Sequence, residues 1–211
     1  MGDVILDLKI AVIEMNHSVT AGLTRDALEN GISAADILNN GLIPGLDEVG
    51  VRFRDGDYFL PDVLMCVKAY DASYQVLEPH LKQGEYESRG KVMLGTVAGD
   101  IHEIGKNILA ALLQGNGFDV INLGADVKAD TFLEKARELE PDIIGMSALL
   151  TTTMPEMKEV IDLFGKEGIR DRYRFIIGGS PLSQSFAQEI GADGYGEDAQ
   201  DGVELVKSLM G

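Results

Sequence analysis

In the second half of the chain, short apolar runs alternate with amphipathic stretches of helical spacing. Four runs have the length and composition of buried strands, and they read KVMLGT, DVINLG, DIIGMS and RFIIGG. A fifth, weaker strand is predicted in DGYG, near residue 195. The alternation predicts an α/β fold in which helices cover both faces of a five-stranded parallel sheet. Ligands of such sheets bind beyond the carboxyl ends of the strands, near a topological switch point.

Residues that start or stop helices agree with this alternation. Pro155 lies near the start of EMKEVIDLFGKEG, and Asp130 is expected to cap TFLEKARELE. Gly117 and Gly168 follow helical stretches and are expected to terminate them.

The first 81 residues have helical periodicity and lack a strand pattern. Ser33 is expected to cap AADILNN, and Pro61 suits the first turn of the helix that follows RDGD. We therefore predict a bundle of about four helices. The polar, glycine-bounded segment QGEYESRG follows it at residues 83–90. This places the bundle at residues 1–88 and the α/β domain at residues 89–211.

Composition narrows the range of partners. A formal net charge of -17 argues against phosphate-backbone binding, which needs clustered Lys and Arg. No apolar run is long enough to span a bilayer, and the N-terminus lacks a basic signal-peptide start. The single cysteine, Cys66, excludes an internal disulfide, and its apolar neighbours favour a buried thiol. We expect a cytoplasmic protein that binds neither nucleic acid nor membranes.

Polar loops follow three of the predicted strands, and they read GDIHEIGKN, SALLTTTM and GGSPLS. In the first loop, His102 follows Asp100 by two residues, so a carboxylate could bond one imidazole nitrogen while the other faces a metal. On these two side chains alone, a helix cap beside a polar loop histidine is the simpler interpretation. A phosphate loop fits poorly, because five residues separate the glycines and Asn107 stands where Ser or Thr should hold magnesium.

The run GDIHEIGKNIL resembles the Asp-x-His-x-x-Gly signature of corrinoid-binding domains, as in cobalamin-dependent methionine synthase and the corrinoid proteins of methanogens and acetogens. Ser147-Ala148-Leu149 resembles the Ser-x-Leu motif of that family, and Gly178-Gly179 its paired glycines. The resemblance implies a Rossmann-like, flavodoxin-like domain that binds cobalamin or a related corrinoid. It also implies base-off/His-on binding, in which the cofactor's own base leaves cobalt.

The resemblance assigns His102 to cobalt, Asp100 to the imidazole, and Gly105 to the close approach of the cofactor's tail. Ser147, Leu149 and Thr151 are cofactor-binding candidates of the second loop, and Gly178 and Gly179 would leave room for the tail. Thr153 aligns with a serine that continues the relay from the carboxylate. The alternatives are helix capping by the threonines and an ordinary strand-end turn at the glycines.

The resemblance extends to VGVRFRDGDYFLPDVL, which is similar to the cap that shields the upper face of the corrin. Phe53 and Leu60 match the shielding positions. Because most apolar side chains of a helical bundle fill its core, core packing is the alternative for both residues.

For the family, the resemblance implies a non-autonomous methyl carrier, with methylcobalamin present during turnover. A substrate-specific methyltransferase supplies the methyl group, and a second methyltransferase passes it to tetrahydrofolate or a thiol coenzyme. A reductive activator is a further expected partner, and the donor is a methylamine, methanol or a methoxylated aromatic. The cap must also move during transfer, so residues 83–90 are the candidate hinge.

Three other functions stay open at this point. They are a cobalamin-binding sensor without methyl transfer, a small subunit of an adenosylcobalamin mutase, and a corrinoid-free nucleotide or response-regulator-like domain. The acidic chain disfavours a regulator that contacts DNA.

Overall fold

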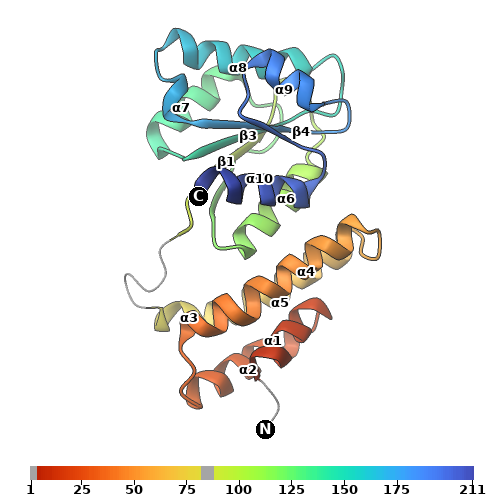
Figure 1. Cartoon of the computed structure of the whole chain (residues 1–211), viewed down its shortest axis with the longest axis vertical. Helices are drawn as coiled ribbons and strands as arrows, with labels where there is room; N and C mark the ends of the chain where they lie inside the picture. Colours follow the sequence, from red (N-terminus) through yellow and green to blue (C-terminus); the bar gives the residue numbers. More distant parts are fainter. Residues whose placement is uncertain (1–3, 82–87) are drawn as a thin grey trace. The chain divides into compact units, whose positions relative to one another are not determined.

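The computed structural model describes residues 4–81 and 88–211, and it divides the chain into two compact units (Figure 1). One unit contains the described N-terminal helices, and the other contains residues 89–113 and 118–211. The segment predicted as a hinge, residues 83–90, lies mostly outside the described residues.

The first unit is helical, as the periodicity predicts. Its elements are α1 (Val4–Ile13), α2 (His17–Glu29), α3 (Ala34–Ile37), the π-helix η1 (Leu38–Leu42), α4 (Ile43–Arg54), α5 (Leu60–Leu77) and the 3-10 helix η2 (Glu78–His80). Ser33 caps α3, because its Oγ accepts a hydrogen bond of 3.0 Å from the backbone N–H of Asp36. Pro61 lies in the first turn of α5. Both boundary predictions are therefore confirmed.

The core of the bundle combines apolar side chains with a short row of buried hydroxyls. Leu8, Leu46 and Val63 are fully buried, as expected for the inward faces of amphipathic helices. Thr24 Oγ1 donates a 2.8 Å hydrogen bond to Ser73 Oγ, which joins α2 to α5. Because this hydroxyl finds a partner, its burial does not carry the cost of an unsatisfied polar group.

Cys66 is a buried structural thiol on α5, as predicted. Its Sγ lies 3.4 Å from the carbonyl oxygen of Ile13. Burial, together with the negative charge of Asp62, raises the pKa of this thiol to about 11. The reactive thiolate is therefore scarce at neutral pH.

We expect native Cys66 to resist alkylation by iodoacetamide at pH 8 and to react readily in urea. A pKa raised by two units lowers the thiolate fraction about 100-fold, and packing excludes the reagent as well. Mass spectrometry of timed samples measures the labelling. Equal rates with and without urea would show that the thiol is exposed in the native protein.

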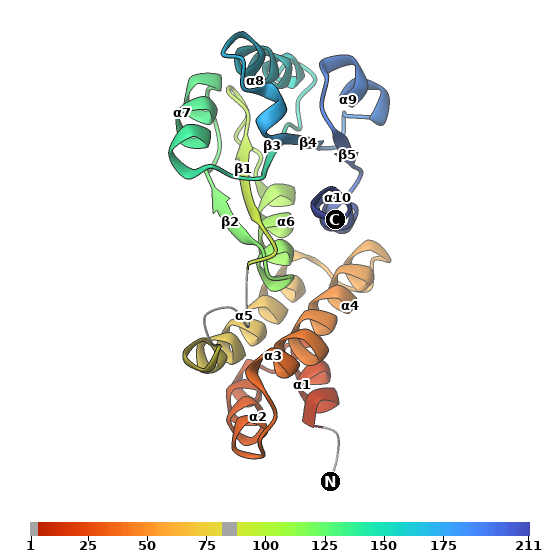
Figure 2. The same ribbon diagram turned by 60° about the vertical axis from the view of Figure 1, so that its left-hand side comes forward.

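The second unit is built on a parallel sheet in the order β2-β1-β3-β4-β5 (Figure 2). Its strands are β1 (Lys91–Thr96), β2 (Asp119–Asn122), β3 (Ile143–Ser147), β4 (Arg174–Gly178) and β5 (Gly194–Gly196). All five predicted strands are present, including the weak fifth. The chain reverses its direction of travel across the sheet between β1 and β3, so the loops after these strands flank the switch point.

Helices cover both faces of this sheet, as predicted. They are α6 (Ile104–Gly115), α7 (Ala129–Leu139), α8 (Met154–Lys166), α9 (Gln184–Ile190) and α10 (Ala199–Met210), with the 3-10 helix η3 (Arg170–Arg172) before β4. Figure 1 shows α6 and α10 on one face and α7, α8 and α9 on the other. On the second face, Phe164 packs edge-to-face on Phe175 with ring centroids 5.0 Å apart.

One helix boundary differs from the prediction. Lys128 occupies the N-cap of α7, and Asp130 lies within the first turn, so Asp130 is not the cap. Its negative charge still suits the positive end of the helix dipole, which explains why an acid stands there. Gly117 and Gly168 have φ of 84° and 69° after α6 and α8, so they terminate these helices as predicted.

Among the described residues, no helix is both long enough and apolar enough to cross a membrane.

Candidate functional site

The site is centred on Asp100, which lies in the loop between β1 and α6 and is fully buried. Its Oδ1 accepts hydrogen bonds from the backbone N–H of His102, at 3.0 Å, and from His102 Nδ1, at 2.8 Å. Its Oδ2 faces the loop after β3 and accepts from the backbone N–H groups of Leu149, at 2.7 Å, and Leu150, at 3.2 Å. One carboxylate therefore joins the two loops beside the switch point.

This environment decides the charge of Asp100. Burial alone would raise the pKa of the carboxyl, because it disfavours the charged form. The hydrogen bonds from the backbone and ring of His102, from the backbone of Leu149 and from the Thr153 hydroxyl outweigh burial and hold the pKa well below its usual range. Asp100 is therefore a carboxylate at neutral pH.

His102 is held by this carboxylate and is open on its other side. Its side chain is 47% exposed, although its partner Asp100 is completely buried. Because Nδ1 is engaged by a carboxylate, its proton is retained there and Nε2 is the nitrogen left to act as a ligand. The pair thus provides an oriented, electron-rich imidazole, which is the arrangement of many metal-binding histidines.

Thr153 extends this arrangement from the start of α8. Its Oγ1 lies 2.9 Å from Asp100 Oδ2 and 2.9 Å from the carbonyl oxygen of Leu150. It occupies the N-cap position but makes no capping hydrogen bond with its side chain. Asp100 also fails to cap α6, which begins only at Ile104. Asp100 is therefore not a helix cap, whereas Thr153 stands at the N-cap position with its hydroxyl bonded to Asp100.

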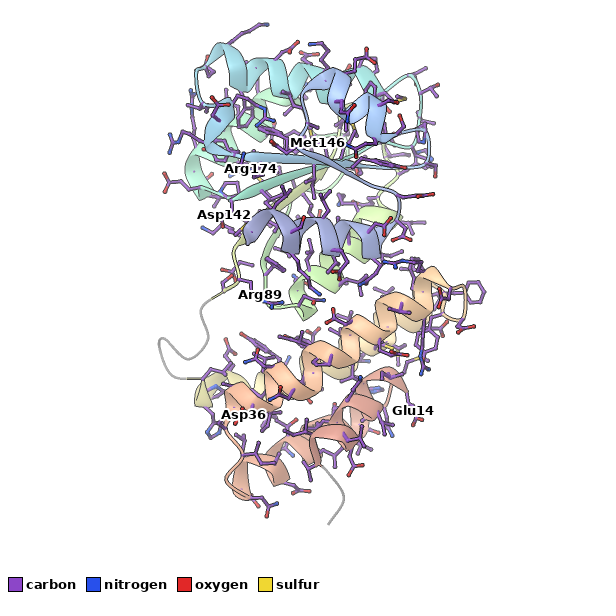
Figure 3. All side chains as sticks on the ribbon, in the orientation of Figure 1. Glu14, Asp36, Arg89, Asp142, Met146 and Arg174 are labelled. Carbon is purple, nitrogen blue, oxygen red and sulfur yellow. The ribbon has the colours of Figure 1, made fainter. Side chains whose placement is uncertain are left out.

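A cavity of about 490 Å³ opens beside His102 at the carboxyl ends of the strands. Figure 3 shows Met146, one of its lining residues, toward the carboxyl end of β3, and Arg174 at the amino end of β4. The other apolar side chains of the wall include Leu94, Leu109 and Ile176. A cavity of this size and character suits a bulky organic group.

The register of the sheet explains why the cavity opens here. Thr96, Ser147, Gly178 and Gly196 form one row across β1, β3, β4 and β5. The row begins with two hydroxyls, which bond to each other at 2.8 Å, and it ends with two glycines. Side-chain volume therefore falls away toward β4 and β5, and the wall recedes.

The predicted glycines serve two different purposes. A Cβ added to Gly179 would lie 1.9 Å from the carbonyl oxygen of Ala148, and φ there is 139°, so the fold itself requires glycine. Gly105 is different, because it lies in α6 and a Cβ there would meet nothing within 4 Å. Packing does not explain Gly105, and the space beside it belongs to the cavity that it lines.

We expect Asp100→Asn to destabilise the ligand-free protein by roughly 1–3 kcal/mol. The substitution replaces one carboxylate oxygen by an NH₂ group, and this group meets a backbone N–H donor whichever way the amide is turned. Urea denaturation measures the change. The deficit should shrink below about pH 4, since a carboxyl whose pKa is lowered by folding loses its stabilising effect as it protonates. His102→Ala is the control, and its half-exposed ring should cost less. An equal or larger loss in His102→Ala would contradict this account.

Comparisons with known proteins agree with this geometry. Family models described as B12 binding domains match residues 90–204 and 4–78. A corrinoid protein of Desulfitobacterium hafniense is 45% identical over 97% of this chain and 96% of its own length. Trimethylamine corrinoid protein 1 of Methanosarcina acetivorans is 39% identical over 99% of this chain and 97% of its own.

The chain belongs to the family of B12-binding corrinoid proteins. A solved structure supports this at the level of the fold. The methanol:cobalamin methyltransferase complex of Methanosarcina barkeri contains a chain with a TM-score of 0.85 and 30% identity, covering 99% of this chain and 80% of that one. A helical cap followed by a Rossmann-like domain, the predicted fold class, is therefore confirmed.

The residues of this corrinoid protein fit a corrinoid. The ring brings its own equatorial nitrogens, so a single protein imidazole suffices for the metal. Next to His102, Ile101 and Ile104 are 76% and 63% exposed and also line the cavity, which makes an apolar rim for a flat macrocycle. Neither isoleucine was predicted as a site residue. Their apolar character in an otherwise polar loop was the available signal.

The remaining predicted site residues of the corrinoid protein differ in whether they line the cavity. Ser147 and Leu149 line the cavity, whereas Thr151 is exposed and is absent from the described lining. Phe53 and Leu60 lie in the first unit and are partly exposed, so neither is among the fully buried residues of the bundle core. Shielding of the corrin by these two residues stays a prediction.

A further aromatic side chain of the cap, Phe59, was not predicted as a site residue. Phe59 directly precedes α5 and is 68% exposed, which is unusual for phenylalanine. Its position between the turn-like RDGD and Pro61, outside the helical periodicity, was the feature of the sequence that could have indicated its exposure.

We expect Gly105→Ala to weaken corrinoid binding at least tenfold without destabilising the corrinoid-free protein. A methyl group there would occupy cavity space and, in a helix, would not strain the backbone. The matched control is Gly165→Ala in α8, where an added Cβ also meets nothing within 4 Å. Equilibrium dialysis measures binding and thermal unfolding measures stability. Equal affinity in the two variants would show that Gly105 does not face the cofactor.

Proposed function

We propose that this corrinoid protein carries a methyl group between a substrate-specific methyltransferase and a second methyltransferase acting on an acceptor. The observation that carries the proposal is the buried Asp100 carboxylate, which holds a half-exposed His102 beside a cavity with mainly apolar walls. The names of the relatives support it, because they include a trimethylamine corrinoid protein and a methanol:cobalamin methyltransferase complex.

When bound, the corrinoid supplies a cobalt ion that takes up a methyl group from one substrate and releases it to another. His102 would hold the cobalt through Nε2. Asp100 keeps the proton on Nδ1 and strengthens the imidazole as a donor. Thr153 holds the carboxylate from the far side and, with the backbone of Leu149, fixes its orientation.

The cavity is proposed to take the tail of the cofactor, in the base-off/His-on form. Gly105 leaves space on the α6 side, and Gly178 lets the wall recede at the end of β4. Ser147, the register partner of Gly178 at the end of β3, also lines the cavity. The apolar wall suits an aromatic base, since an aromatic ring gains from leaving water.

The helical cap, for which we propose residues 1–88, is proposed to shield the upper face of the corrin. Phe53 and Leu60 are partly exposed and would supply apolar surface, and the exposed Phe59 would add to it. Such a cover would exclude water and oxygen from a reactive metal centre. Methyl transfer would then require the cap to withdraw.

The partners of this carrier are proposed to supply the substrate sites. One methyltransferase would bind the methyl donor, a methylamine, methanol or a methoxylated aromatic. A second would present tetrahydrofolate or a thiol coenzyme. A reductive activator would return oxidised cobalt to the active state.

We expect the protein to bind one corrinoid per chain with a visible spectrum that depends on His102. His102→Ala should retain corrinoid in the cavity but show the spectrum of a cofactor without a protein nitrogen ligand. His80→Ala is the matched control, because His80 is exposed and lies in the first unit. Spectra after gel filtration and reconstitution measure both effects.

The outcomes separate the functions. A spectrum that depends on His102, followed by methylation of the bound corrinoid with a donor methyltransferase, supports a carrier. Spectral dependence without methyl transfer to any partner would favour a sensor. Failure to retain corrinoid would contradict both.

A further inference from the structure

A second carboxylate, Asp126, contacts the turn that leads into Asp100. This turn comprises residues 97–100 and is closed by a 3.1 Å hydrogen bond from the backbone N–H of Asp100 to the carbonyl oxygen of Val97. Gly99 has φ of 75°, the pattern of a type II turn, in which the N–H of the third residue has no partner within the turn. That N–H needs an acceptor from elsewhere.

Asp126 supplies this acceptor from the loop between β2 and α7. Its Oδ1 accepts a 2.7 Å hydrogen bond from the backbone N–H of Gly99. Its own backbone N–H donates at 3.0 Å to the carbonyl oxygen of Asp100. Asp126 therefore bonds to the N–H of Gly99 and to the C=O of Asp100, the groups that flank the Gly99–Asp100 peptide bond.

The backbone of Asp126 makes this double contact at a cost. Its φ is 55°, in the left-handed region that residues with a Cβ rarely adopt. Relaxation to an ordinary conformation would turn the N–H away from Asp100. A strained backbone conformation persists only where surrounding contacts hold it, and residues in such conformations are common at functional sites.

We infer that Asp126 is a positioning residue that fixes the Asp100 carboxylate and, through it, the orientation of His102 toward cobalt. The inference rests on the proposed function. Asp126 does not touch the imidazole or the cavity wall in the described contacts. It acts by holding the turn from which Asp100 reaches both His102 and the loop after β3.

Three variants separate the hydrogen bond from charge and backbone strain. Asp126→Asn keeps an acceptor oxygen and a side chain that tolerates the left-handed region. Asp126→Gly relieves the strain but removes the acceptor for Gly99. Glu140→Gly is the matched control, because Glu140 also has a positive φ, of 45°, at the end of α7 and makes no contact with the site.

The measurement is the ratio of His102-coordinated to uncoordinated corrinoid at neutral pH, read from the visible spectrum of each loaded protein. Asp126→Gly should bind corrinoid but lower this ratio roughly tenfold, as expected for one lost hydrogen bond to a charged group. Asp126→Asn and Glu140→Gly should keep the wild-type ratio. A residue that serves stability alone would change the unfolding temperature and leave the ratio intact.

Two results would overturn the inference: an unchanged ratio in Asp126→Gly, or an equal loss in Asp126→Asn. If Asp126→Gly retains no corrinoid, amide hydrogen exchange of the corrinoid-free proteins decides. Faster exchange at the His102 N–H in Asp126→Gly than in Asp126→Asn supports the inference, and equal exchange overturns it. If the wild-type protein retains no corrinoid, the proposed function itself fails.

Discussion

The hydrogen bonding of a buried carboxylate organises the second unit. Asp100 is withdrawn from water, so its charge must be stabilised entirely by protein donors. Those donors come from the loop after β1, the loop after β3 and the first residue before α8. Satisfying the carboxylate therefore joins the two loops at the switch point. The same bonds leave the His102 ring with one fixed nitrogen and one free nitrogen.

The cavity depends on the sheet as much as on the loops. Its wall recedes because side-chain volume falls along one register row, from Thr96 and Ser147 to Gly178 and Gly196. Gly179 serves the backbone, whereas Gly105 leaves space that packing does not need. An oriented imidazole next to a cavity with apolar walls is what base-off/His-on binding requires. The fold supplies both at one edge, which connects the structure to the proposed methyl carrier.

The sequence predicted the architecture well because periodicity is a local property. All five strands are confirmed, as are Ser33 and Pro61 at their helix starts. The assignment of Asp130 as a cap was wrong by two positions, since Asp suits both the cap and the first turn. The resemblance named three residues that the structure brings together, Asp100, His102 and Thr153, whereas the two side chains of the first loop alone favoured a helix cap for Asp100. Ile101, Phe59 and Asp126 escaped notice because their significance depends on exposure, backbone conformation or contacts distant in the sequence.

The central claim is that the His102 imidazole, and not the cofactor's own base, coordinates cobalt. Electron paramagnetic resonance of the cobalt(II) form tests it most directly, in protein grown with either natural or ¹⁵N-labelled histidine. Coordination by His102 predicts that the nitrogen splitting changes from a triplet to a doublet in the labelled protein. A triplet that persists with labelled histidine would show that the nitrogen belongs to the cofactor, and it would contradict the account.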